Sequence, residues 1–256
     1  MRILACAVFT VLGLWPLTPA GAQELARRVD AAPDGEVRMT FASRGGICQW
    51  DDGTQERSRV REHAGSSWRS ACVGGPVWVI LVRRDGRVVQ VKRGVGYELP
   101  EASGPITDMG RVGAVQAAEY LLDLAEHSGD GNVGRLAIHT AVLADSATVW
   151  PALLRIARSE GAPRAARRNA VFWLGQMASR LVREELSTLA RDRDREVAGE
   201  AVFALSRRLT RENVSELLEI AREHPDPEIR SKALFWLGYS SDPRVLDLYR
   251  ELLASR

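Results

Sequence analysis

Hydrophobic and polar positions mostly alternate from residue 36 to residue 99, as they do along half-buried β-strands. In the stretch 37–41 every second residue is apolar. A longer apolar run at 77–82 is followed by Asp85-Gly86 and then by another alternating run at 87–91. Two such runs around an Asp-Gly pair predict a β-hairpin.

The residues between the first strand and the hairpin, 42–70, are polar and rich in glycine, serine and arginine, so they predict a loop. A hairpin alone is marginally stable in water. We therefore expect residues 23–105 to form a small β unit that docks on the helices that follow.

Beyond residue 105 the apolar spacing becomes helical and the pattern repeats. The segment AVFWLG at 170–175 recurs as AVFALS at 201–206 and as ALFWLG at 233–238. Helices that carry this segment are called first-type helices below. Three of them are clear, and a weaker one is expected around residues 135–143.

Each copy is followed by a second helix with a motif of its own, and this motif also occurs before the first copy. It occupies residues 153–157, 186–190 and 217–221, and 121–125 and 249–253 extend the series. These second-type helices alternate with the first type. Helices that pack on a partner and on both neighbouring repeats need wide apolar surfaces, which explains the continuous apolar runs.

Helix ends are also predicted by the sequence. Asp194, Asp226 and Asp242 are expected N-caps, and the last two precede proline. Gly175 and Gly238 are expected just past first-type helices, with the positive φ that favours glycine.

At these residues the chain resembles the HEAT-like repeat family, particularly the short bacterial repeats also found in phycobilisome lyases. Residues 168–175 match its pattern R-x-A-x-x-x-L-G, and residues 229–238 match I-R-x-x-A-x-x-x-L-G. Residues 194–206 match less well, with Ala198 where Arg230 stands and Ser206 in place of glycine. The resemblance covers more than half of the chain.

What the resemblance implies is a mainly α fold, with a right-handed α-α superhelix of the HEAT type over residues 106–256 that binds proteins along a groove. It does not imply lyase chemistry, because a fold does not fix a function. The whole chain also resembles exported bacterial HEAT-repeat proteins of unknown function.

Residues 1–22 are typical of an export signal. Arg2 precedes an apolar run at 3–15, two prolines follow, and Ala20-Gly21-Ala22 forms a small-x-small cleavage site. We expect cleavage after Ala22, a periplasmic or secreted protein, and no transmembrane domain after signal removal. An uncleaved anchor is the alternative, but the run is short for a span of about 30 Å.

Cys48 and Cys72 remain after signal removal. In an oxidising compartment they predict a disulfide, which contributes roughly 3 kcal/mol in the chain-entropy model. A redox-active or metal-binding pair is the alternative. It requires close cysteine spacing or partnering histidines, and the sequence has neither.

Net charge and motifs limit the candidate chemistry. The formal net charge is +2, with 35 basic and 33 acidic residues, which argues against a nucleic-acid partner. The histidines, His63, His127, His139 and His224, show no metal-ligand spacing, and His139 is read as a packing residue. We predict no catalytic residue, no metal site and no cofactor.

Two surface columns are the candidate partner contacts. Arg158, Arg191 and Arg222 end successive second-type helices and could hold acidic groups of a partner. Alternatively they only complement the helix dipoles. The second column includes Arg155 and Glu219, together with Thr188 and Glu251, and the alternative for it is a solvated face.

The sequence therefore favours an exported scaffold that binds an unknown protein along its repeats. The alternative is a lyase-like or other enzyme that handles a small molecule; a deep pocket with a perturbed carboxylate or histidine would favour it. A third reading is self-association through the last helix, residues 244–255.

Overall fold

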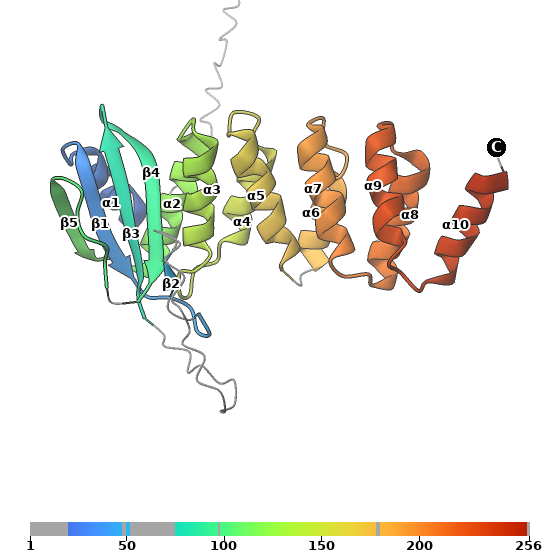
Figure 1. Cartoon of the computed structure of the whole chain (residues 1–256), viewed down its shortest axis with the longest axis horizontal. Coiled ribbons are helices and arrows are strands. Elements are labelled where there is room, and N and C mark those ends of the chain that lie inside the picture. Colours follow the sequence, from blue (N-terminus) through green and yellow to red (C-terminus); the bar gives the residue numbers. More distant parts are fainter. Residues whose placement is uncertain (1–19, 48–49, 52–74, 97, 178–179, 255–256) are drawn as a thin grey trace, which may run out of the picture.

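The computed structural model describes residues 20–47, 50–51, 75–96, 98–177 and 180–254. This part of the chain is mainly helical and carries one small mixed β-sheet at its N-terminal end (Figure 1). The strands are β1 (Gly35–Phe41), β2 (Trp50–Asp51), β3 (Val77–Arg84), β4 (Arg87–Val95) and β5 (Ile106–Arg111). The helices are α1 (Ala20–Asp30), α2 (Ala114–His127), α3 (Gly131–Ala141), α4 (Trp150–Arg158), α5 (Arg164–Gly175), α6 (Arg180–Leu189), α7 (Arg195–Ser206), α8 (Arg211–Glu223), α9 (Pro227–Leu237) and α10 (Pro243–Ala254).

Two of the sequence predictions concern residues outside this description. Cys48 and Cys72 both lie outside the described residues, and so does the export signal up to residue 19. Helix α1 begins at Ala20 and spans the predicted cleavage position after Ala22. Cleavage there would remove the first three residues of α1.

The sheet has the strand order β2-β4-β3-β1-β5. The predicted hairpin is confirmed as β3 and β4, in which Arg84 pairs with Arg87. Between them Asp85 and Gly86 have φ values of 52° and 72°, as a type I′ turn requires. β1 is antiparallel to β3, and β5 is parallel to β1. The sheet thus includes residues 106–111, which the sequence pattern assigned to the helical part.

One face of the sheet shares a hydrophobic core with α1 and α2. Val37, Met39 and Phe41 alternate toward it and are almost fully buried, together with Leu25 of α1. Arg83 of β3 is buried among them. Its guanidinium donates hydrogen bonds to backbone carbonyl oxygens at the C-terminal end of α1 and in the hairpin turn, those of Val29, Asp30 and Gly86.

The opposite face of the sheet holds a buried carboxylate, Glu36, which is 3% exposed. It accepts hydrogen bonds from Arg38 Nη2 at 2.6 Å, Ser103 Oγ at 2.7 Å and Lys92 Nζ at 3.3 Å. Burial acts to raise the pKa of Glu36, but these hydrogen bonds outweigh it and lower the pKa to about 2. Through the hydrogen bond from Ser103, the Glu36 carboxylate connects the segment after β4 to the sheet.

The remaining helices form two rows that extend away from the sheet (Figure 1). First-type helices α3, α5, α7 and α9 form one row, in which each contacts the next. The weak first-type helix expected around residues 135–143 is α3. In the other row, α2 contacts α4 and α4 contacts α6, whereas the contacts from α6 to α8 and from α8 to α10 are sparser. The second-type side is therefore more open toward the C-terminal end.

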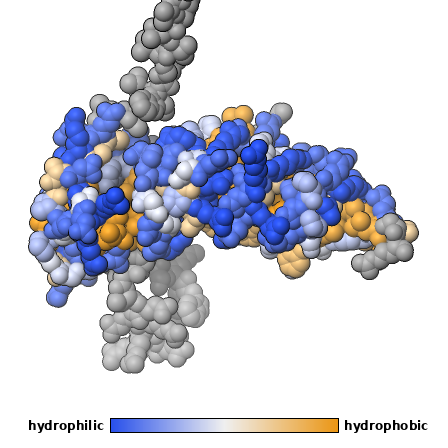
Figure 2. Space-filling view, turned by 90° about the horizontal axis from the view of Figure 1, so that it is seen from above, coloured by the Kyte–Doolittle hydropathy of each residue, from blue (hydrophilic) through white to orange (hydrophobic). Residues whose placement is uncertain are grey.

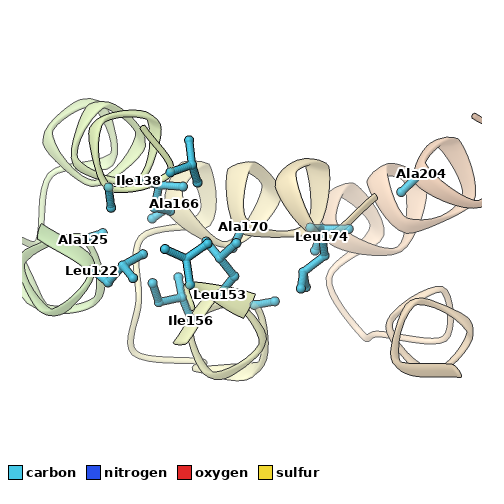
Figure 3. Close-up of a cluster of buried hydrophobic side chains, with 14 of the residues drawn as sticks. Leu122, Ala125, Ile138, Leu153, Ile156, Ala166, Ala170, Leu174 and Ala204 are labelled. Atoms are coloured by element: carbon cyan, nitrogen blue, oxygen red, sulfur yellow. The ribbon is translucent and has the colours of Figure 1, made fainter. Parts of the chain in front are cut away.

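Apolar side chains fill the space between the rows. Figure 3 shows Leu153 and Ile156 of α4 beneath Ala170 of α5, close to Ile138 of α3. All four are fully buried. Several of the buried positions are alanine, and small side chains let neighbouring helix backbones approach closely.

Two predicted N-caps are confirmed, because the Asp194 and Asp226 carboxylates accept backbone N–H groups at the starts of α7 and α9. The prediction of positive φ at Gly175 and Gly238 is wrong. Gly175 belongs to α5, and Gly238 has a φ of −58°. A Cβ at Gly175 would lie 2.6 Å from the Cβ of Ala204, so glycine is needed there for close helix packing.

Candidate partner-binding surface

Each first-type helix carries one ring-bearing side chain nine residues after its N-cap. The N-caps are Asp130, Pro163, Asp194 and Asp226, and the rings are His139, Phe172, Phe203 and Phe235. All four rings are at least partly exposed. Since the helices are packed in register, these rings form one line across the row, which we call the ring column.

Tryptophans on two of the helices pack against the ring of the preceding helix. Trp173 lies edge-on to His139, with centroids 5.3 Å apart and an interplanar angle of 83°, and Trp236 lies 5.1 Å from Phe203. Such ring pairs are favourable beyond the area that they bury. In α7 the equivalent residue is Ala204, so Phe172 receives no indole from the next helix.

The ring column is most exposed at α9. Phe235 is 58% exposed and Tyr239 is 69% exposed, and both contact the Trp236 ring. In the face that Figure 2 shows, the helical part is mostly hydrophilic, with hydrophobic patches beside the sheet and toward the C-terminal end. A repeating line of aromatic side chains that ends in two exposed rings is unusual on a surface that only faces water.

Two polar side chains of α5 and that of its C-cap residue have a buried atom without a hydrogen-bond partner. These atoms are Asn169 Oδ1, Trp173 Nε1 and Gln176 Nε2. They are four and three residues apart, so they share one helix face. A buried unsatisfied polar group costs about 1–3 kcal/mol, and native proteins contain few of them. A cluster of three therefore points to a ligand or ordered water at this face.

His139 lies beside this cluster and is kept neutral. Burial lowers its pKa to about 4, and the nearby positive charges of Arg93 and Arg135 act in the same direction. Its Nε2 is 3.0 Å from Asn169 Nδ2, which is the geometry of an amide donating to a neutral imidazole. The side chain therefore contributes a polar, uncharged ring at neutral pH.

A small cavity of about 240 Å³ opens next to Phe172. Arg135, Arg168, Asn169 and Glu200 line it together with that ring. Burial raises the pKa of Glu200, although Arg168 and Lys232 oppose the shift. The cavity is smaller than the roughly 300–1,000 Å³ of ordinary small-molecule pockets, so it suits one side chain of a larger ligand.

The arginines predicted to bind a partner are all engaged within the chain. Each pairs with a carboxylate of a neighbouring second-type helix: Arg155 with Glu126 at 2.7 Å, Arg158 with Glu185, Arg191 with Glu216 at 2.8 Å and with Glu219 at 2.6 Å, and Arg222 with Glu251 at 3.0 Å. Two predicted contact residues, Arg191 and Glu219, therefore bind each other. The ion pairs of these arginines therefore link each second-type helix to the next one.

The more open second-type side holds two further hollows. One, of about 430 Å³, lies between α8 and α10, and another, of about 500 Å³, lies around Arg191, Glu219 and Asp226. Both are lined by basic and acidic side chains together. The second hollow is also lined by His224, which accepts the backbone N–H of Asp226 at 3.1 Å.

Among the residues that the structure describes, no group of three or more histidine, cysteine, aspartate or glutamate side chains could hold a metal ion. No helix in the described ranges is long and apolar enough to cross a membrane.

The sequence pattern missed the ring column because it treated the phenylalanines as part of the buried apolar run. A signal was present, since alanine and leucine at the flanking positions already supply the buried stripe of a helix. A phenylalanine repeated beside that stripe at 172, 203 and 235 lies outside it.

Comparison with known proteins gave no match: no family model fits the chain, and neither the curated proteins nor the solved structures include a significant relative.

Proposed function

We propose that this protein is a scaffold that holds a partner protein along the ring column of its first-type helices. The observation that carries the proposal is the line of partly exposed rings, Phe172 and Phe203, that leads to the exposed Phe235, with Trp173 and Trp236 beside them. Aromatic residues are enriched in protein interfaces, because they bury large areas at low conformational cost.

The same proposal includes the architecture and the location. We infer a HEAT-type, right-handed superhelix for the two rows, supported by the alternation of helix types, their common N-cap positions and the repeat motif. We also infer export followed by cleavage after Ala22, supported by the apolar N-terminal run and the small residues at 20–22.

The first-type face is a better candidate than the arginine column on energetic grounds. A partner acid that binds Arg191 must displace two intramolecular carboxylates, Glu216 and Glu219. A partner that covers Phe235 displaces only water. The second process removes apolar surface from solvent, worth about 25 cal/mol per Å².

Photo-cross-linking tests this assignment. A photoreactive amino acid is placed at Phe235 in one variant and, as a control, at the exposed Thr188 of second-type helix α6 in another. Each variant is irradiated in an envelope extract of the source cells. We expect one dominant protein adduct from position 235 and none from position 188.

Adduct formation at position 188 but not at position 235 would move the binding surface to the second-type helices. The absence of a protein adduct at both positions would contradict the scaffold.

The alternative function, handling of a small molecule, is favoured by one observation: the half-buried neutral His139 beside unsatisfied polar atoms. It requires a larger cavity than the 240 Å³ beside Phe172. A ligand screen that follows the ring proton shifts of His139 by NMR distinguishes the two. A small molecule that saturates His139 at micromolar concentration would support the alternative.

A further inference from the structure

The distance between successive rings of the ring column favours one backbone conformation for a peptide that lies across the first-type helices. Packed helices are about 8–10 Å apart, so successive rings recur at about that distance. A polyproline II helix has three residues per turn and a rise of about 3.1 Å, which places equivalent residues about 9 Å apart. An extended β-strand repeats at about 6.7 Å, and an α-helix at about 5.4 Å. Only the polyproline II period fits one residue to each helix.

The unsatisfied atoms on α5 fit the same ligand. A polyproline II segment has no internal hydrogen bonds, and proline has no N–H, so the segment is rich in acceptors and poor in donors. Trp173 Nε1 and Gln176 Nε2 are donors without an acceptor. Asn169 Oδ1 can accept from the N–H of a non-proline residue within the segment.

The side chains that carry these atoms lie at the surface of the first-type row. Asn169, Trp173 and Gln176 are each partly exposed, although the atoms in question are buried. A change of rotamer of the Asn169 or Gln176 amide turns it outward without altering the backbone. Arg207 donates to Gln176 Oε1 at 3.3 Å and lies 5.9 Å from the Phe203 centroid, so it connects the α5 donors with the next ring.

We propose that the ring column binds a proline-rich segment in the polyproline II conformation. Its prolines lie against Phe172, Phe203 and Phe235, and its carbonyl oxygens accept hydrogen bonds from Trp173 and Gln176. Aromatic grooves recognise this conformation because the segment is already ordered before it binds. The inference rests on the proposed function, since it names the chemistry of the partner at the same surface.

The test uses a peptide of about twelve residues built from Pro-Pro-Leu repeats, titrated into the full chain by isothermal titration calorimetry. A Gly-Ser-Leu peptide of equal length is the control. We expect saturable binding of the first peptide only. Trp173→Phe keeps a ring but loses the donor, so we expect binding about threefold to tenfold weaker. Phe235→Ala should weaken binding in the same range.

Folding defects are separated from binding defects by two further measurements. Trp173→Phe removes an unsatisfied buried donor but also removes volume from a packed ring, so the two effects oppose each other and its thermal midpoint should change little. Trp150→Phe, on second-type helix α4, is the matched control and should leave the affinity unchanged.

Equal binding of the two peptides, or an affinity insensitive to both Trp173→Phe and Phe235→Ala, would overturn the polyproline II proposal. If cross-linking from position 235 still captures a partner in that case, the scaffold stands and only its occupant changes. If neither experiment gives binding, both proposals fail.

Discussion

At the scale of single residues, Glu36 controls how the β unit responds to acid. Its pKa is lowered from 4.5 to about 2, so its contribution to stability is complete above pH 4.5 and is lost as the pH falls toward 2. We expect Glu36→Gln to cost roughly 1–3 kcal/mol at pH 7 and to flatten the fall in unfolding free energy between pH 4.5 and 2. Urea unfolding across this pH range measures both effects.

The exposed Glu101→Gln variant serves as the control for Glu36→Gln and should retain the normal acid dependence. Identical pH profiles for wild type and Glu36→Gln would contradict the role assigned to the Glu36 hydrogen bonds.

Gly175 makes a second prediction at this scale. A Cβ there would lie 2.6 Å from the Cβ of Ala204, so Gly175→Ala must push α5 and α7 apart. We expect a loss of about 1–2 kcal/mol, because overpacking outweighs the helix propensity that alanine gains. Chemical denaturation provides the measurement. Gly161→Ala, where a Cβ meets no atom within 4 Å, should change stability much less.

The double variant Gly175→Ala with Ala204→Gly restores the space between the helices and should recover part of the loss. No recovery would mean that the Gly175 effect does not act through Ala204.

At the scale of helices, the ion pairs of the second-type row join one repeat to the next. Arg191, two residues after the end of α6, pairs with Glu216 and Glu219 of α8, and its pKa is raised chiefly by the Glu216 hydrogen bond. We expect Arg191→Glu to destabilise the helical array by about 1 kcal/mol at low salt, and less at high salt because exposed pairs are screened. Thermal unfolding at two salt concentrations measures the effect.

Arg193→Glu is the matched control, because Arg193 is an exposed arginine two residues away with no ion pair to a described residue. Equal destabilisation by the two reversals would mean that only overall charge matters, and the bridging role of Arg191 would be wrong.

Helix types and their order follow from the sequence, because the helices carry periodic apolar stripes and several begin at a side-chain cap. The Asp194 and Asp226 caps and the β3–β4 hairpin are local features, and the structure confirms them. Helix α1 and strand β5 could not be predicted in the same way. Their positions depend on tertiary contacts, such as the Arg83 hydrogen bonds to the end of α1 and the pairing of β5 with β1.

At the scale of the whole molecule, the rows extend in one direction from the sheet (Figure 1). A compact chain of this length would have a radius of gyration of roughly 18 Å. We expect small-angle X-ray scattering of the protein to give a clearly larger value and a distance distribution with a long tail. A symmetric distribution near the compact value would mean that the rows fold back in solution.

The candidate surface illustrates why a binding face is harder to predict than a fold. The sequence predicted Arg158, Arg191 and Arg222 as one column, but it could not show that carboxylates of neighbouring repeats reach them. Exposure of the ring column likewise depends on how far successive helices rotate against each other. Both are properties of packing between segments about thirty residues apart, which periodicity does not contain.

The residue after each ring alternates between small and large along the array: Thr140, Trp173, Ala204, Trp236. The contacts between α3 and α5 and between α7 and α9 therefore each contain an indole. The contact between α5 and α7 instead contains the close approach of Gly175 to Ala204. Deleting the repeat that contains α5 would place Ala204 of α7 next to His139 and leave that imidazole without an indole neighbour. Deleting the repeats of α5 and α7 together would place Trp236 of α9 next to His139 and restore an imidazole–indole contact. The order of small and large residues thus limits which repeats can be removed without losing the contact to His139.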